Sequence, residues 1–373
     1  CHARDPEWLA TLYRHAGAVE KITESKVANY WHSHWVTYPV QNHLRDLPVE
    51  DRIAALSDLM VAQARTGTEP PAHYRAWLES QYGTFITERF YAEYTAKYWR
   101  VPMDTLGTDW LGGRLLPSQL PRIIRGAFVP QREEQSVFAA FHYPARGGFY
   151  AFFAPFAQGL DITCQARACR IDTARRRVEF AQGQVVDYDR LATSIPLPEL
   201  VAILPEAPAA VREAAARLRC TQLLCVNLLV RRPALCPYHW FYIYDPDIEV
   251  ARVKVNSNVA PHSVPEGVTA LQCEIFRRQD EVFDINRLVD GTIRDLGRLL
   301  GFTADEVRAA GHVQVKYAYP ISDLVRASAV QTIVDWLHEQ RIYPMGLFGL
   351  WRYLWSDAAF RSGEETARRL LAG

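Results

Sequence analysis

The chain has 373 residues, and its 42 Lys and Arg residues balance 42 Asp and Glu residues, so the formal net charge is zero. This balance predicts no extended basic surface for nucleic acid, and no apolar run of about 18 residues predicts a membrane span. The length exceeds the roughly 250 to 300 residues at which single cores stop growing, so two domains are expected.

Seven cysteines are scattered along the chain without C-x-x-C pairs or a histidine partner at zinc spacing. Most lie in apolar, strand-like runs, which favours reduced, buried thiols and a cytoplasmic location. His32 and His34 would point to one side of a strand, but the sequence offers no convincing third ligand, so no metal site is predicted.

The first hundred residues alternate helical and strand-like patterns. Helical spacing covers residues 6–16, aromatic β-like residues follow over 28–40, and two helices are predicted over 49–64 and 72–99. The second of these helices is unusually aromatic, which indicates either a well-filled core or a helical subdomain packed over something flat. Its aromatic residues are Tyr74, Trp77, Tyr82, Phe85, Phe90, Tyr91, Tyr94, Tyr98 and Trp99.

The middle of the chain predicts an α/β domain followed by a sheet. An apolar helix is expected from Gly148 to about Gly159, then strands over 162–171 and 177–180, an arrangement consistent with nucleotide binding. Four β-branched and aromatic runs between 221 and 276 predict an antiparallel sheet, one face of which would form a substrate wall. Helices over 286–300 and 323–340 precede a closing strand and helix, so the two domains are predicted to be interleaved.

The C-terminal stretch from Gly346 to Leu371 combines glycines, an aromatic run and a Ser-Gly pair before an amphipathic helix. One interpretation is an ordinary last helix with Ser362 as N-cap and acidic residues in its first turn. The other is a helix start whose uncovered N–H groups and dipole attract a phosphate or an electron-rich ring edge.

Four stretches in one order resemble flavin-dependent oxidoreductases of the protoporphyrinogen oxidase and amine oxidase superfamily, especially the relatives of UDP-galactopyranose mutase. The Tyr-Thr-x-Lys-x-Trp signature is the most specific of them, and the resemblance spans nearly the whole chain. The stretches are Tyr38-Pro39-Val40-Gln41-Asn42, Tyr94-Thr95-Ala96-Lys97-Tyr98-Trp99, Tyr143-Pro144 with Gly147-Gly148, and Gly346 through Gly363.

The resemblance implies an α/β fold in which a Rossmann-like FAD-binding domain is interleaved with a substrate domain of antiparallel sheet and helices. The FAD-binding domain is assigned to 131–200 and 341–373, together with 1–20. The substrate domain is assigned to 27–130 and 205–340.

The resemblance also implies site residues. Contacts with FAD are expected from Gly148, Gly346, Gly349, Tyr353, Asp357, Ser362 and Gly363. Contacts with substrate are expected from Asn42, Tyr94, Lys97, Trp99, Arg252 and Tyr319. No catalytic side chain is named, because the flavin itself would carry the chemistry. Core packing stays open for Tyr94 and Trp99, a solvated helix charge for Lys97, and a structural role for Arg252 and Tyr319.

Two features depart from the family pattern. No G-x-G-x-x-G motif occurs, so either some dozens of residues precede Cys1 in the complete protein or the dinucleotide is held in another way. Where the mutase motif has an Arg and an Asp, this chain has Leu347 and Trp355. These replacements remove a bidentate donor and a carboxylate, which argues against mutase activity.

Three functions follow. The first is an FAD-dependent oxidoreductase acting on a sugar-linked or other polar small molecule. The second is a sugar-nucleotide mutase that uses reduced flavin, with a nucleotide sugar as its ligand. The third is a flavin-free binding or interaction protein derived from the family. The sequence does not indicate the oligomeric state.

Overall fold

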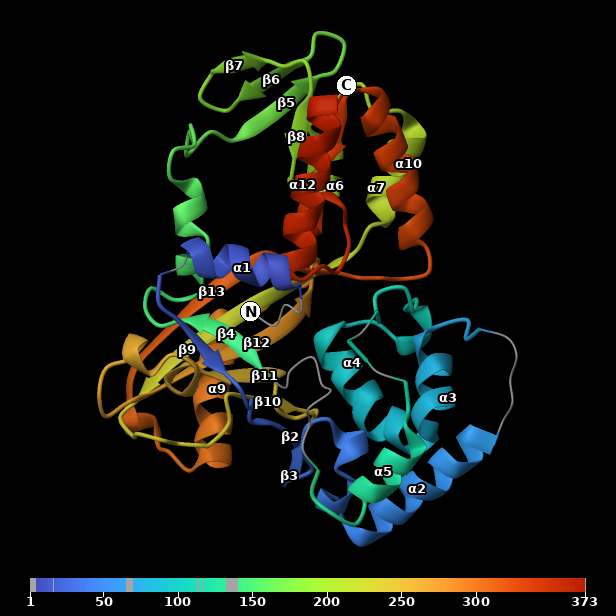
Figure 1. The fold of residues 1–373 in the computed structure, drawn as a ribbon, viewed down its shortest axis with the longest axis vertical. Helices are drawn as coiled ribbons and strands as arrows, with labels where there is room; N and C mark the ends of the chain where they lie inside the picture. The colour runs from blue at the N-terminus through green and yellow to red at the C-terminus, as the bar shows by residue number, and fades with distance from the viewer. Residues whose placement is uncertain are drawn as a thin grey trace. The chain divides into compact units, whose positions relative to one another are not determined.

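A computed structural model describes residues 5–15, 17–64, 70–112, 114–115, 117–131 and 140–372. The chain divides into two compact units, each built from separate segments (Figure 1). Unit 1 contains Ala16–Phe152 and Thr221–Ala318. Unit 2 contains Ala3–His15, Phe153–Cys220 and Tyr319–Gly373. Both helices and strands occur in each unit, so the mixed α/β class predicted from sequence is confirmed.

Unit 1 combines one large sheet with a group of helices. Its strands are β1 (Val19–Ile22), β2 (Val27–Trp31), β3 (His34–Thr37), β4 (Phe141–Pro144), β9 (Cys220–Val230), β10 (Trp240–Ile243), β11 (Arg252–Val255), β12 (Thr269–Arg278) and β13 (Val307–Pro320). Its α-helices are α2 (Val49–Ala64), α3 (Tyr74–Ile86), α4 (Glu93–Tyr98), α5 (Leu120–Gly126), α8 (Asn256–Val259) and α9 (Ile285–Leu300). The terminal residues of β9 and β13 belong to unit 2.

The large sheet has seven strands in the order β13-β9-β12-β11-β10-β2-β3. The neighbours from β9 to β10 pair antiparallel, which confirms the sheet predicted from the four apolar runs. Strand β2 adds to β10 in parallel, with Val27 opposite Trp240, and β3 returns antiparallel to it. Strand β13 was not predicted from the sequence, and almost all of its residues are exposed in the fold.

One face of this sheet forms the core of unit 1. Val226 of β9, Phe241 of β10 and Cys273 of β12 point to it, and all three are fully buried. Helix α9 covers this face through Leu288 and Leu296. Burial of one Val, Leu or Phe side chain in this core contributes about 1.5 to 3 kcal/mol to the stability of the fold.

The single helix predicted over 72–99 is in fact three segments. Helix α3 contains a kink at Gly83, whose φ of 80° lies in the left-handed region. A Cβ at this position would lie 2.8 Å from the backbone of Asp58 in α2, so the close approach of the two helices requires glycine. A π-helix over Thr87–Ala92 then leads into α4.

Unit 2 contains smaller sheets and most of the C-terminal helices. Its helices are α1 (Pro6–His15), α6 (Leu197–Ala202), α7 (Ala209–Arg217), α10 (Arg326–Glu339), α11 (Gly346–Gly349) and α12 (Ser356–Ala372). Its strands are β5 (Ala168–Asp172), β6 (Arg177–Phe180), β7 (Val185–Asp187), β8 (Leu191–Thr193) and β14 (Ile342–Pro344). β8 and β14 pair in parallel, whereas β5, β6 and β7 form an antiparallel sheet.

The helix expected to run to Gly159 is instead a pair of 3₁₀ turns, Phe149–Phe152 and Ala154–Ala157. Gln158 leaves the second turn in an extended conformation with ψ of 128°, so helical geometry stops there. Pro155 also has no N–H to donate to a preceding turn. None of the helices in the described ranges combines the length and the apolar character needed to cross a bilayer.

Candidate functional site

The second face of the seven-stranded sheet carries polar side chains at regular positions. In the register of neighbouring strands, Glu274 of β12 lies opposite Arg252 of β11, and Arg252 lies opposite Tyr242 of β10. Side chains two residues apart in a strand share a face, so Lys254 lies on the same face as Arg252. We call this surface, defined by Tyr242, Arg252, Lys254 and Glu274, the polar face.

An ion pair organises the centre of the polar face. Nη2 of Arg252 donates to Oε1 of Glu274 at 2.6 Å. Glu274 is only 9% exposed, and its Oε2 is buried and accepts no hydrogen bond from the described residues. A buried acceptor without a donor costs free energy unless a ligand or water supplies one. The polar face therefore retains an acceptor for a hydroxyl or ammonium group.

Lys254 adds a second cation to the polar face. Its Nζ lies 4.4 Å from the ring centroid of Tyr143 in β4 and donates to the hydroxyl of that tyrosine at 3.4 Å. Burial, together with the positive charge of Arg252, lowers the pKa of Lys254 to about 8.

Tyr94 contacts the polar face from helix α4. Its ring centroid lies 5.4 Å from that of Tyr242, in an edge-to-face arrangement, and 5.4 Å from that of Tyr244. Burial raises the pKa of Tyr94 well above its ordinary value, with Arg252 acting in the opposite direction. Two residues singled out in the sequence, Tyr94 and Arg252, are thus brought to the same place.

The other predicted substrate residues of unit 1 have different surroundings. Trp99 is 3% exposed, with its ring 5.1 Å from both Tyr98 and Trp110. Asn42 is the last residue of the 3₁₀ turn Val40–Asn42, and its backbone carbonyl accepts a hydrogen bond from the side-chain amide of Gln131 at 3.0 Å. For Trp99 this geometry matches the core-packing interpretation that the sequence left open.

Lys97 is not a solvated helix charge, as one interpretation of the sequence had it. It is 9% exposed, and its Nζ donates to the backbone carbonyls of Ile243, Asp245 and Val250 at 2.8, 3.1 and 2.8 Å. These three bonds use all three ammonium donors.

In unit 2, the predicted helix start at Ser362 is wrong. Helix α12 begins at Ser356, so Ser362 lies inside the helix and Glu364 and Glu365 lie beyond its first turn. Ala358 and Ala359 favour helix and extend it toward the N-terminus. The Ser362 hydroxyl donates to the carbonyl of Ala359 at 2.6 Å and accepts the N–H of Gly346 at 2.9 Å.

The remaining predicted cofactor contacts of unit 2 lie in helices α11 and α12 or in the segment between them. Gly349 allows close packing, because a Cβ there would lie 2.9 Å from the carbonyl oxygen of Thr193 in β8. Asp357 stands in the first turn of α12 and accepts the N–H of Ala358 at 2.8 Å. The ring of Tyr353 contacts that of Tyr319 at 5.0 Å, so Tyr319 lies in unit 2 with the cofactor candidates.

Two glycine candidates have room beside them. A Cβ at Gly363 in α12 or at Gly148 would meet nothing within 4 Å. Gly148 has a φ of 65° and belongs to unit 1. The first turn of α12, with its N–H groups, and the open surface at Gly363 are compatible with a flavin ring, whose reduced form carries negative charge.

Tyr242, Lys254 and Glu274 were not predicted from the sequence. The available signal was the alternation of charged and apolar residues in two strands, in which Arg252 and Lys254 are separated by Val253, and Gln272 and Glu274 by Cys273.

Comparisons with known proteins agree on the fold. The sequence profile of the family described as flavin containing amine oxidoreductase matches residues 28–372. The structure of a reduced UDP-galactopyranose mutase is similar over 100% of this chain and 83% of its own, at 24% identity and a TM-score of 0.91.

More distant structures share the fold as well. A variant of putrescine oxidase matches 99% of this chain and 86% of its own, with 14% identity and a TM-score of 0.63. A fatty acid isomerase from P. acnes that produces CLA matches 98% and 84%, with 12% identity and a TM-score of 0.60. At these identities the similarities establish the fold, and the fold alone does not define a substrate.

Proposed function

This chain belongs to the family of flavin containing amine oxidoreductases, and we propose that it is an FAD-dependent oxidoreductase acting on a sugar-linked or other polar small molecule. The observation that carries the substrate class is the polar face. It places two cations, one buried carboxylate and the hydroxyl-bearing ring of Tyr242 on one wall of the sheet, with the ring of Tyr94 from α4 against it. Such a wall suits a ligand rich in hydroxyl or anionic groups.

Residues of unit 2 are proposed to hold the flavin. The N–H groups in the first turn of α12 would face the electron-rich edge of the ring, and Asp357 would accept hydrogen bonds from ribityl hydroxyls. The open surface at Gly363 gives the ring room to approach the helix. When bound, the flavin would supply the redox chemistry by accepting a hydride from the substrate.

On the polar face, each side chain has a task that its contacts support. Glu274 would accept a hydrogen bond from a substrate hydroxyl through Oε2, while its Oε1 keeps Arg252 in place. Lys254 would attract an anionic group, and at neutral pH most of its amine is charged, because its pKa of about 8 lies above that pH. Tyr94 would cover a flat part of the ligand.

Mutase-like chemistry on a sugar nucleotide is the second candidate, and the similarity to the reduced UDP-galactopyranose mutase favours it. The substitutions at Leu347 and Trp355 weigh against it. The same two substitutions are also compatible with a flavin-free binding protein. In such a protein the polar face would bind the ligand.

The visible absorption spectrum tests the proposal. The purified protein would be titrated with FAD. Flavin bands at about 375 and 450 nm are expected in the loaded protein, and their bleaching by a candidate substrate identifies an oxidoreductase. Colourless protein that takes up no FAD would refute the enzyme proposal and favour the binding protein.

An Arg252→Met variant separates substrate binding from flavin binding. It should retain the flavin bands and lose bleaching by the substrate, because Arg252 belongs to unit 1 and the proposed flavin contacts of α12 belong to unit 2. Bleaching of this variant at the wild-type substrate concentration would remove Arg252 and Glu274 from the proposed site.

A further inference from the structure

Lys97 uses its whole hydrogen-bonding capacity inside unit 1. Its ammonium donates to the backbone carbonyls of Ile243, Asp245 and Val250. Ile243 is the last residue of β10, and the other two lie in the segment 244–251 between β10 and β11, which we call the β10–β11 loop. An ammonium has three donors, so none is left for a ligand. Any part that Lys97 plays at the polar face is therefore indirect, through the elements that it joins.

The elements joined by Lys97 carry two predicted substrate residues of the polar face. Tyr94 lies three residues before Lys97 on α4, one turn away on the same side of the helix. Arg252, the first residue of β11, lies two residues after Val250. The contact at Val250 thus connects the helix that carries Tyr94 with the strand that carries Arg252.

The same contact lies beside the rings that Tyr94 touches. Ile243 stands between Tyr242 and Tyr244 in the chain, and the ring centroid of Tyr94 lies 5.4 Å from each of theirs. The three N–H bonds of an ammonium point in different directions, and a hydrogen bond is lost once its atoms part by about 1 Å beyond the usual length. Bonds to three carbonyls therefore restrict the movement of α4 against the sheet where Tyr94 packs on Tyr242.

The amine of Lys97 is charged at slightly acidic pH. Burial lowers the pKa of Lys97 to about 7, whereas the negative charges of Asp245, Asp247, Glu249 and Glu93 act in the opposite direction. At pH 6 the amine therefore carries all three donors, and experiments on this contact are set at that pH.

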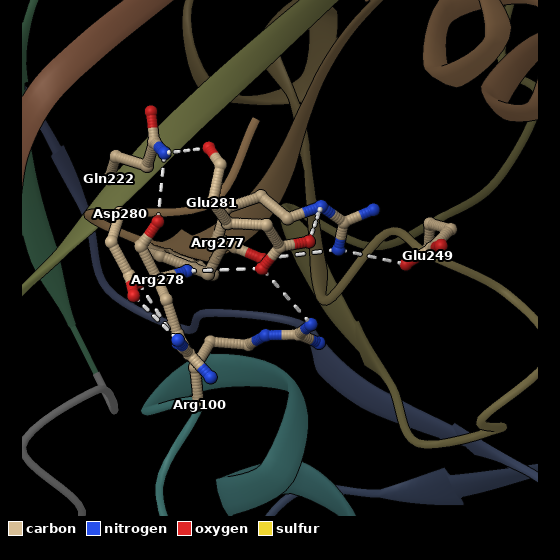
Figure 2. A network of polar contacts seen from close by, with 8 residues as sticks. Arg100, Gln222, Glu249, Arg277, Arg278, Asp280 and Glu281 are labelled. Carbon is tan, nitrogen blue, oxygen red and sulfur yellow. Dashed lines mark hydrogen bonds and ion pairs between the residues drawn. The ribbon is translucent and has the colours of Figure 1, made fainter. Parts of the chain in front are cut away.

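A second connection joins the end of α4 to the same loop, and it consists of side chains alone (Figure 2). Arg100, which follows α4, lies 3.5 Å from Glu281, and Glu281 lies 3.2 Å from Arg277. Arg277 in turn binds Glu249 of the loop at 3.0 Å. Successive pairs of long side chains allow more movement than direct bonds to backbone carbonyls. Arg100 therefore offers a matched control on the same helix.

We propose that Lys97 is the positioning residue of the polar face: it joins α4 to the β10–β11 loop and thereby holds Tyr94 and Arg252 at a fixed separation. The consequence for the reaction rests on the proposed function, because a ligand that contacts both side chains would be held only at that separation. Displacement of a binding group by about 1 Å can lower the rate by as much as about a hundredfold.

Hydrogen exchange of backbone amides in the whole chain at pH 6 tests the contact without a ligand. Three peptides are compared: 93–100 from α4, 244–251 from the loop and 269–278 from β12. In Lys97→Met the first two should lose about tenfold or more of their protection, while β12 keeps the wild-type value. An equal loss in all three would identify a general structural role and overturn the proposal, as would unchanged protection of the loop.

Arg100→Met is the matched variant, because it removes the other connection of α4. Protection of 244–251 should stay within about twofold of the wild type, since Arg277 still binds Glu249. The peptide 93–100 should lose less protection than it does in Lys97→Met. A larger loss in Arg100→Met than in Lys97→Met would assign the positioning role to the ion pairs instead.

A measurement on the wild-type chain decides the matter if Lys97→Met does not fold. In exchange at rising urea, below the unfolding transition, 93–100 and 244–251 should open with the same free energy and the same urea dependence, because one contact holds both. Two separate openings, or opening only in step with β12, would overturn the proposal.

The position of Tyr94 is measured in the same proteins. With ¹³C-labelled tyrosine, the rings of Tyr94 and Tyr242 are assigned from their phenylalanine variants. A nuclear Overhauser contact between the two rings is expected in the wild type and in Arg100→Met, and it should be absent from Lys97→Met. Persistence of this contact in Lys97→Met would overturn the positioning role. Failure to take up FAD would instead refute the proposed function and leave the result on Lys97 intact.

Discussion

The two faces of the seven-stranded sheet share the same strands and differ in almost every other respect. One face consists of aliphatic and aromatic side chains sealed by α9, such as Phe241 and Val253. The other presents Arg252, Lys254 and Glu274, which are paired with one another or with tyrosines. Because side chains alternate along a strand, neighbouring residues serve opposite purposes. The first face supplies the apolar core of unit 1, whereas the second carries paired polar groups.

The largest expected effect comes from the apolar face. Phe241→Ala removes a fully buried ring from the apolar face. It should lower the free energy of unfolding by about 3 to 5 kcal/mol, because apolar burial is lost and a cavity remains. Urea denaturation measures this loss. A loss below about 1 kcal/mol would mean that the apolar face does not dominate the stability of unit 1.

An intermediate effect is expected at the centre of the polar face. Arg252→Met leaves Glu274 largely buried without its partner and should cost about 2 kcal/mol, between the values for exposed and for buried pairs. Glu274→Gln and the double variant complete a cycle that isolates the coupling of the two side chains. Strictly additive losses would show that the pair contributes nothing beyond its separate contacts.

The smallest effect gives the sharpest comparison, because the chain offers the same residue on each face. Cys273 is fully buried on the apolar face, and Cys273→Ser should cost about 1 to 3 kcal/mol, since the hydroxyl is buried among apolar groups. Cys225 is also buried, but on the polar face, where its thiol donates to Oδ1 of Asn227 at 3.8 Å; a serine hydroxyl there keeps an acceptor, so Cys225→Ser should cost less than Cys273→Ser. Equal losses in both variants would contradict the division between the faces.

The sequence predicted the sheet well because the pattern that specifies it is local. The runs that became β9, β10, β11 and β12 are rich in β-branched and aromatic residues, and their turn residues separate them clearly. The family was also predicted correctly, from motifs spread along the chain. Of the substrate candidates in unit 1, Tyr94 and Arg252 reach the same face.

What the sequence could not predict depends on contacts between distant segments. The environment of Lys97 is set by carbonyls about 150 residues further along the chain, and the same spacing in an isolated helix would leave it in water. Ser362 looked like an N-cap because Ser-Gly is a common helix start. Its hydroxyl instead receives the N–H of Gly346, a contact that no local pattern reveals.

The parallel pairing of β2 with β10 has a consequence for biosynthesis. The backbone N–H of Lys26 donates to Nδ1 of His239, and the backbone N–H of His32 donates to Oδ1 of Asp245. The two residues of each pair are 213 positions apart in the chain. At 5 to 20 residues per second, the ribosome needs about 10 to 40 s to deliver the partner strand after β2 has emerged. During this interval β2 and β3 have been synthesised, but the strand β10 with which β2 pairs has not.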